Sequence, residues 1–172
     1  MRQLRDDYTI KASEPYTKAI VKYVTEKIGC NYLIKQIDVE MDSNKNEIDF
    51  FKIKLLDIIK NNNIKLVLDI HGASENRPFD IELGTLYNLS ADFSTINELK
   101  EAFIENGITN VEINNPFKGG GITQFIYANT DIDVIQIEIN RKYRDINKSE
   151  KLKQVCDCLI RFIEQYNKYI KD

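Results

Sequence analysis

The chain has 172 residues, of which 42% are hydrophobic and 30% are charged, and its formal net charge is −3. This length and apolar content predict one ordinary domain that folds without help from a disulfide or a metal. The near-neutral charge gives no sign of a nucleic-acid-binding surface, and no apolar run reaches the roughly 20 residues that cross a membrane.

The first half of the chain alternates between helix and strand signals. Apolar residues at helical spacing predict a helix that begins near Ser13-Glu14-Pro15 and ends at Gly29. Residues 33–39 are predicted to form a short strand, and residues 48–63 an amphipathic helix that ends at a run of asparagines. The nearly unbroken apolar run at 64–70 is typical of a strand covered on both faces, as in parallel sheets.

The second half continues the alternation. Thr95 and Glu98 have the spacing of a capping box and predict the start of a helix that Gly107 ends. Strands are predicted at 79–86, 111–114 and 133–140, and further helices at 122–129 and 148–170. Strands separated by helices predict a three-layer α/β fold, in which a mainly parallel or mixed sheet carries helices on both faces. No linker or repeat divides the sequence, so residues 1–172 are interpreted as a single domain.

The cysteine and histidine content limits the metal chemistry of the chain. Cys30, Cys156 and Cys158 are too few and too irregularly spaced for a disulfide framework or a four-cysteine zinc site, so we expect free thiols and a cytoplasmic protein. His71 is the only histidine, which excludes a histidine-rich metal site built from this chain alone.

His71 directly follows the strand predicted at 64–70. Its imidazole is therefore expected at the carboxyl edge of the sheet, where ligands collect in α/β folds. Gly72 would let the chain turn away at that point. A surface histidine at the end of a strand is the alternative interpretation.

The strand predicted at 133–140 alternates strictly between isoleucines and polar residues. A surface edge strand would show the same alternation, and periodicity alone favours that interpretation. The alternative interpretation is a strand that carries a catalytic carboxylate. It is supported by the polar side chains near the strand's carboxyl end, which are Gln136, Glu138 and Asn140, followed by Arg141. A general-base carboxylate would belong at that edge of the sheet.

Arg77 lies six residues after His71. The planar guanidinium of arginine pairs with a carboxylate through two parallel hydrogen bonds, so Arg77 is a candidate for binding a substrate carboxylate. A structural ion pair with Asp80 or Glu82 is an equally open interpretation.

The glycine loop, from Asn115 to Gly121, contains three consecutive glycines and leads into a predicted helix. A helix N-terminus after such a loop often binds an anion. The spacing differs from that of a phosphate-binding loop, so nucleotide binding has little support, and a flexible surface loop is the simpler interpretation.

Taken together, these segments resemble the N-formylglutamate amidohydrolase family, which is related in fold to the zinc carboxypeptidases. The resemblance follows the order of the motifs over almost the whole chain. Its residues are Asp69-Ile70-His71-Gly72, the stretch from Glu75 to Thr85, the glycine loop, and Gln136-Ile137-Glu138-Ile139-Asn140.

The resemblance implies a zinc site with an activated water. Glu14 matches the acidic zinc ligand that opens the first helix, His71 matches a histidine ligand, and Glu138 matches the catalytic carboxylate. A catalytic zinc takes three protein ligands and leaves one position for water. The zinc lowers the pKa of that water, and the carboxylate accepts its proton during attack on an amide.

The resemblance also implies the kind of substrate. An acylated amino acid or an acidic peptide would offer an amide beside a carboxylate, and an arginine, Arg77 or Arg141, could bind that carboxylate. Asn140 and Lys118 complete the set of expected substrate-binding residues. We expect neither a nucleic-acid partner nor a membrane.

One feature of the family pattern is missing. The first zinc histidine of the family would fall before Met1, and helix-forming residues begin almost at once, without the strand that carries this histidine. We therefore expect either a chain that begins inside a longer protein or a naturally degenerate family member. In the second case the protein would be an inactive remnant that binds a small acidic ligand or a protein partner.

Overall fold

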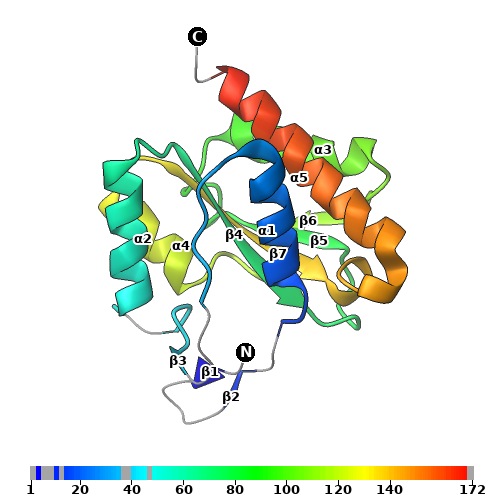
Figure 1. The fold of residues 1–172 in the computed structure, drawn as a ribbon, viewed down its shortest axis with the longest axis horizontal. Helices are drawn as coiled ribbons and strands as arrows, with labels where there is room; N and C mark the ends of the chain where they lie inside the picture. Colours follow the sequence, from blue (N-terminus) through cyan, green and yellow to red (C-terminus); the bar gives the residue numbers. More distant parts are fainter. Residues whose placement is uncertain (1–2, 5–9, 12–13, 36–39, 46–47, 170–172) are drawn as a thin grey trace.

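The computed structural model describes residues 3–4, 10–11, 14–35, 40–45 and 48–169. A four-stranded mixed sheet with the strand order β4-β7-β5-β6 forms its centre (Figure 1). These strands are β4 (Leu66–Ala73), β5 (Ile81–Gly84), β6 (Val111–Ile113) and β7 (Asp133–Asn140). β4 and β7 are parallel, as are β5 and β6, whereas β5 runs antiparallel to β7.

Helices cover both faces of this sheet. They are α1 (Thr17–Ile28), α2 (Phe50–Asn61), α3 (Phe93–Glu105), α4 (Gly121–Asn129) and α5 (Ser149–Tyr169). The main core joins α1, α3 and α5 to one face, and a smaller cluster joins α2 and α4 to the other. Two 3-10 turns, η1 (Arg141–Tyr143) and η2 (Ile146–Lys148), connect β7 to α5. The expected three-layer α/β fold is thus confirmed. None of these described helices has the length and apolar character needed to span a bilayer.

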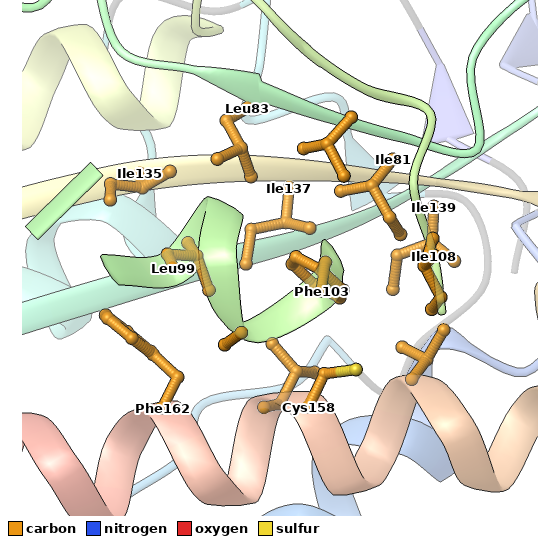
Figure 2. Packing of buried hydrophobic residues seen from close by; sticks show 14 of the residues in the cluster. Ile81, Leu83, Leu99, Phe103, Ile108, Ile135, Ile137, Ile139, Cys158 and Phe162 are labelled. Carbon is orange, nitrogen blue, oxygen red and sulfur yellow. The ribbon is translucent and has the colours of Figure 1, made fainter. Parts of the chain in front are cut away.

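β7 is a central strand, which corrects the interpretation of 133–140 as a surface edge. It lies between β4 and β5, and its residues from Val134 to Asn140 are buried. Ile135, Ile137 and Ile139 point into the main core, where they meet side chains of α3 and α5 (Figure 2). The alternation therefore separates an apolar core face from a polar face.

β4 is parallel to β7, as expected, but it lies at the edge of the sheet. Its residues 66–70 are only half-buried, but Leu66, Leu68 and Ile70 pack against the main core and Val67 packs against the smaller cluster, so both faces of the strand are covered as predicted.

The helix boundaries follow local signals with one exception. Gly29 ends α1 in the left-handed conformation (φ 76°), and the Asp49 carboxylate caps α2 by accepting a hydrogen bond from the Lys52 N–H. The predicted capping box at Thr95 is wrong because Asp92 is the N-cap of α3. The Thr95 hydroxyl donates to Asp133 instead, at 2.6 Å.

The predictions before α2 are met only in part. Residues 33–35 form no strand, and residues 36–39 lie outside the described part of the chain. Two short strands precede the first helix, β1 (Gln3–Leu4) and β2 (Ile10–Lys11). They form with β3 (Glu40–Met41) a separate sheet ordered β2-β1-β3, and neither β1 nor β2 carries a histidine. All three cysteines are free thiols.

Candidate functional site

The polar face of the sheet brings together side chains from three neighbouring strands. His71 of β4 lies in register with Glu138 of β7, which lies in register with Glu82 of β5. Residues in register project from the same face of a sheet. On this face α2 and α4 pack near the beginnings of β4 and β7, against Val67 and Val134. The row of ionisable residues follows farther along β4 and β7.

His71 is held between two carboxylates. Its Nδ1 lies 3.3 Å from Oε2 of Glu14, and its Nε2 lies 3.0 Å from Oδ2 of Asp69. The same Glu14 oxygen accepts a hydrogen bond from the Gly72 N–H at 3.0 Å, so this carboxylate is fixed to β4. The Asn44 amide nitrogen is a further neighbour of Nε2, at 3.0 Å. The structure therefore brings Glu14 and His71 into direct contact.

The surroundings of His71 favour a bound cation or proton. Burial alone would lower the pKa of His71, but the carboxylates of Asp69 and Glu14 outweigh burial and raise this pKa well above its usual value. Nδ1 faces the Glu14 carboxylate, while Nε2 faces both Asp69 and the amide nitrogen of Asn44. A metal ion at Nδ1 would replace the proton on that nitrogen.

The arrangement of donors fits part of a zinc site. Two ligands about 2.1 Å from a tetrahedral zinc lie about 3.4 Å apart, close to the observed separation of Nδ1 and the Glu14 oxygen. Asp69 contacts the other ring nitrogen, as the carboxylate partners of zinc-binding histidines do. Within the described ranges no three His, Cys, Asp or Glu side chains form a metal-binding group. Glu14 lies at Nδ1 and Asp69 lies at Nε2, so the two carboxylates cannot bind the same ion. A zinc ion at Nδ1 would therefore have two ligands here, His71 and Glu14.

Glu138 is positioned by Gln136 and the glycine loop. Glu138 is 9% exposed, and its Oε1 accepts a hydrogen bond from the Gln136 amide at 2.9 Å. The carbonyl oxygen of the Gln136 side chain accepts in turn from the Gly120 N–H at 2.6 Å. Gln136 belongs to the polar face that the alternation indicated, but its link to the glycine loop required the tertiary fold.

The glycine loop is held by side chains rather than lying free on the surface. Asn44 accepts two hydrogen bonds at the start of α4, through its backbone oxygen from Gly121 (3.0 Å) and through its Oδ1 from Ile122 (3.2 Å). Protein acceptors thus occupy N–H groups that an anion would need. Asn44 is not among the site residues expected from the sequence, because its contacts with both α4 and His71 arise only in the tertiary fold.

The expected substrate-binding residues have diverse surroundings. Arg77 is exposed, and its guanidinium lies 4.9 Å above the Phe117 ring. Lys118 is also exposed, and its ammonium lies 4.7 Å above the Tyr87 ring. Arg141 is exposed at the start of η1.

Asn140, by contrast, is buried and serves the backbone. Its amide donates to the Phe79 carbonyl at 2.9 Å and to the Arg77 carbonyl at 3.3 Å, which fixes the loop that carries Arg77. Asp80, one of the two alternative ion-pair partners of Arg77, has other partners. It accepts a hydrogen bond from the Tyr143 hydroxyl and pairs with Lys142.

Glu82 is a buried carboxyl that the sequence did not single out as a site residue. It is 0% exposed, one oxygen accepts from the Phe117 N–H at 2.5 Å, and its Oε2 has no hydrogen-bond partner among the described residues. Burial, together with the charges of Glu138 and Glu112, raises the pKa of Glu82 to about 7 against the hydrogen bonds from the loop, which lower it. The proximity of Glu82 to Glu138 follows from the antiparallel pairing of β5 with β7, which the sequence does not show.

A cavity of about 720 Å³ gives access to the Glu14–His71 pair. It runs beside β4, between α1, α2 and residues 30–35, and Asp42 and Asn44 are also among its lining residues. Its volume is in the range of pockets that hold small molecules.

Comparisons with known proteins identify a family and a fold for this chain. The sequence profile of the N-formylglutamate amidohydrolase family matches residues 54–143, more than half of the chain. No curated protein matches. Among solved structures, N-formylglutamate amidohydrolase from Ralstonia eutropha JMP134 is 19% identical with a TM-score of 0.54, and the match covers 64% of this chain and 47% of that chain. The chain thus spans about half the length of that relative.

N-acetylmuramoyl-L-alanine amidases share the fold. The catalytic domain of CwlV from Bacillus (Paenibacillus) polymyxa var. colistinus is 12% identical with a TM-score of 0.56, covering 98% of this chain and 99% of that one. The amidase from Clostridium difficile 630 is 10% identical with a TM-score of 0.53, covering 96% and 88%. From its profile match, the chain belongs to the N-formylglutamate amidohydrolase family.

Proposed function

We propose that this protein is a zinc-dependent amidohydrolase that cleaves the amide of an N-acylated acidic amino acid, with N-formylglutamate as the first candidate. The observation that carries the proposal is the 3.3 Å approach of Glu14 Oε2 to His71 Nδ1, with Glu138 in register beside His71. Family membership supports amide hydrolysis. The name of the Ralstonia relative supports the choice of substrate.

Each residue of the site has a role in this reaction. A zinc ion held by Glu14, His71 and a third ligand from outside the described residues would supply Lewis-acid activation of water and of the amide carbonyl. Asp69 orients the imidazole through Nε2. The carboxylate of Glu138 accepts the proton of the attacking water and delivers it to the leaving amine, while Gln136 fixes its Oε1.

The exposed cationic side chains would orient the substrate. Arg77 stacks on Phe117, whose backbone N–H holds Glu82, so this guanidinium is anchored near the polar row of the sheet. A planar guanidinium suits the carboxylate of an acyl-amino acid. We assign Arg77 to this carboxylate, with Arg141 and Lys118 as further candidates.

The test measures bound zinc and glutamate release from N-formyl-L-glutamate. It uses the 172-residue chain and a version lengthened by any in-frame residues encoded upstream of Met1. We expect zinc-dependent turnover that Glu138→Gln reduces at least about 100-fold, because general-base catalysis contributes about that much. N-formyl-L-glutamine is the control substrate for recognition of the side-chain carboxylate. If neither zinc-loaded version exceeds Glu138→Gln, the proposal fails.

A second candidate is a non-catalytic protein that binds a small acidic ligand or a protein partner. It is favoured by the presence of two, rather than three, zinc ligands in the described part of the chain. This candidate predicts no stoichiometric zinc and a rise in melting temperature with N-formylglutamate that Arg77→Ala abolishes. One tightly bound zinc per chain would exclude it.

A further inference from the structure

Arg144 is a buried arginine that follows η1, and its guanidinium donates only to backbone carbonyl oxygens in the hydrogen bonds described here. It is 2% exposed. Its Nε donates to Ile139 at 2.9 Å, its Nη2 to Ala73 at 2.8 Å, and its Nη1 to Pro15 at 2.5 Å. One side chain therefore connects three segments that are distant in the sequence.

Each acceptor lies next to, or close to, a residue of the proposed site. Pro15 directly follows Glu14, and Ile139 directly follows Glu138. Ala73 lies two residues after His71 on β4. The guanidinium thus fixes the backbone beside the carboxylate ligand, the imidazole ligand and the general base.

Gly72 makes this arrangement possible. A Cβ atom at this position would lie 2.4 Å from Cζ of Arg144, a distance that requires the guanidinium to move. The Gly72 N–H also donates to Oε2 of Glu14. Gly72 therefore lies between the guanidinium and the Glu14 carboxylate and contacts both.

The charge of Arg144 adds to its geometry. Burial lowers the pKa of Arg144, and the charges of Glu14 and Glu138 act in the opposite direction. Arginine remains a cation in proteins, and a buried cation is costly unless opposite charges compensate it. These glutamates need to be ionised to act as a metal ligand and as a base.

We propose that Arg144 is the positioning residue of the site: its guanidinium sets the relative placement of Glu14, His71 and Glu138 and supplies the positive charge that compensates the two glutamates. The roles of these three residues rest on the proposed function. Their arrangement, however, can be measured without turnover.

The experiment uses His71 as a spectroscopic probe, because a single histidine gives a single set of imidazole NMR signals. In the wild-type protein the Nδ1 proton should be shifted downfield by its hydrogen bond to Glu14. Arg144→Met and Arg144→Lys should remain folded by circular dichroism, lose this downfield proton and shift the ring nitrogen signals. Arg161→Met is the matched control, since Arg161 pairs with Glu105 at the surface and should leave the imidazole unchanged.

Turnover provides a second readout. Misplacement of catalytic groups by about 1 Å can cost roughly 100-fold in rate. We expect the Arg144 variants to lower kcat by about that factor with KM unchanged, and Arg161→Met to match the wild type. A wild type without turnover would refute the proposed function, while the imidazole signals would still test Arg144.

Gly72→Ala disturbs the contact between Gly72 and the Arg144 guanidinium without changing Arg144 itself. This variant therefore provides the test if both Arg144 variants unfold. It should displace the guanidinium and alter the imidazole signals. Wild-type signals in a folded Arg144 variant, or in Gly72→Ala when both Arg144 variants unfold, would overturn the proposal. Loss of cooperative folding in all three variants would also overturn it, because Arg144 would then support the whole domain rather than the site.

Discussion

At the scale of single residues, the site depends on carboxyl groups with different surroundings. Glu14 contacts a histidine and a backbone N–H, whereas Glu82 is enclosed beside Glu138 and Glu112 with one oxygen unpaired among the described residues. Opposite charge and hydrogen bonds favour an ionised carboxyl, whereas burial near like charge favours a neutral one. Glu82 should therefore bind a proton at a higher pH than an ordinary glutamate does.

Glu82→Gln should stabilise the protein in a pH-dependent way. The pKa of Glu82 is raised from 4.5 to about 7 in the folded state, so its contribution to stability is complete below about pH 4.5 and is lost as the pH rises through about 7. The variant should therefore gain about 3 kcal/mol over the wild type at pH 8 and little at pH 4.5. Urea unfolding at both pH values measures the difference. The exposed Glu101→Gln is the control, and an equal effect of Glu82→Gln at both pH values would contradict the assignment.

Asp69→Asn should weaken zinc binding. Asp69 orients His71 through Nε2, and loss of such a partner typically lowers metal affinity 10- to 100-fold. Isothermal titration with zinc measures this change in whichever version of the chain binds zinc. Asp57→Asn, an exposed change on α2, should leave the affinity unaltered. Unchanged affinity in Asp69→Asn would show that this carboxylate does not support the metal.

At the scale of elements, the close packing of β5 against the glycine loop holds the polar row in place. A Cβ atom on Gly84 would lie 2.5 Å from the backbone nitrogen of Gly119. The next glycine of the loop binds Gln136, which in turn binds Glu138. A substitution that displaces this loop should therefore affect both stability and catalysis.

Gly84→Ala should destabilise the protein by about 1–3 kcal/mol, the usual cost of overpacking, and lower turnover through the displaced loop. Thermal unfolding and kcat are the measurements. Gly29→Ala offers a contrast, because its Cβ has open space and only the positive φ of 76° is strained. That variant should lose about 1 kcal/mol without loss of turnover. Normal turnover in Gly84→Ala would show that the position of the glycine loop does not affect the catalytic residues.

The elements themselves could largely be predicted from the sequence, because most are specified by local patterns. β7 was bounded correctly at Asp133–Asn140, and α1 and α2 follow from apolar spacing and their end signals. The edge position of β4 and the central position of β7 could not be predicted, since strand order depends on tertiary packing.

The same division holds for the site. The position of His71 after an apolar run predicts a place near the carboxyl end of a strand, and His71 lies within the last three residues of β4. The roles of Asn44, Glu82 and Arg144 could not be predicted, because each depends on contacts between segments far apart in the sequence. An arginine bound to three carbonyls leaves no local pattern that distinguishes it from a surface arginine.

At the scale of the whole molecule, the main hydrophobic core and the site lie on opposite faces of the sheet. The core joins α1, α3 and α5 to β5 and β7 through fully buried side chains such as Phe103 and Phe162 (Figure 2). This core requires no metal, so folding and zinc binding are expected to be separable.

Removal of zinc should therefore leave a folded protein. Treatment with EDTA is expected to preserve the circular dichroism spectrum and a cooperative thermal transition. Zinc at about 100 times its Kd should then add about 2.7 kcal/mol of stability, and Glu14→Gln should remove most of this gain. Unfolding by EDTA would instead indicate a structural metal.

Anomalous diffraction from zinc-soaked crystals would show directly whether Glu14 and His71 bind one zinc ion together. We expect one strong peak about 2.0–2.2 Å from both His71 Nδ1 and Glu14 Oε2, with Asp69 still at Nε2. A zinc ion bound at Nε2 beside Asp69, or no zinc at His71 in crystals that bind it elsewhere, would show that the pair is not a zinc site.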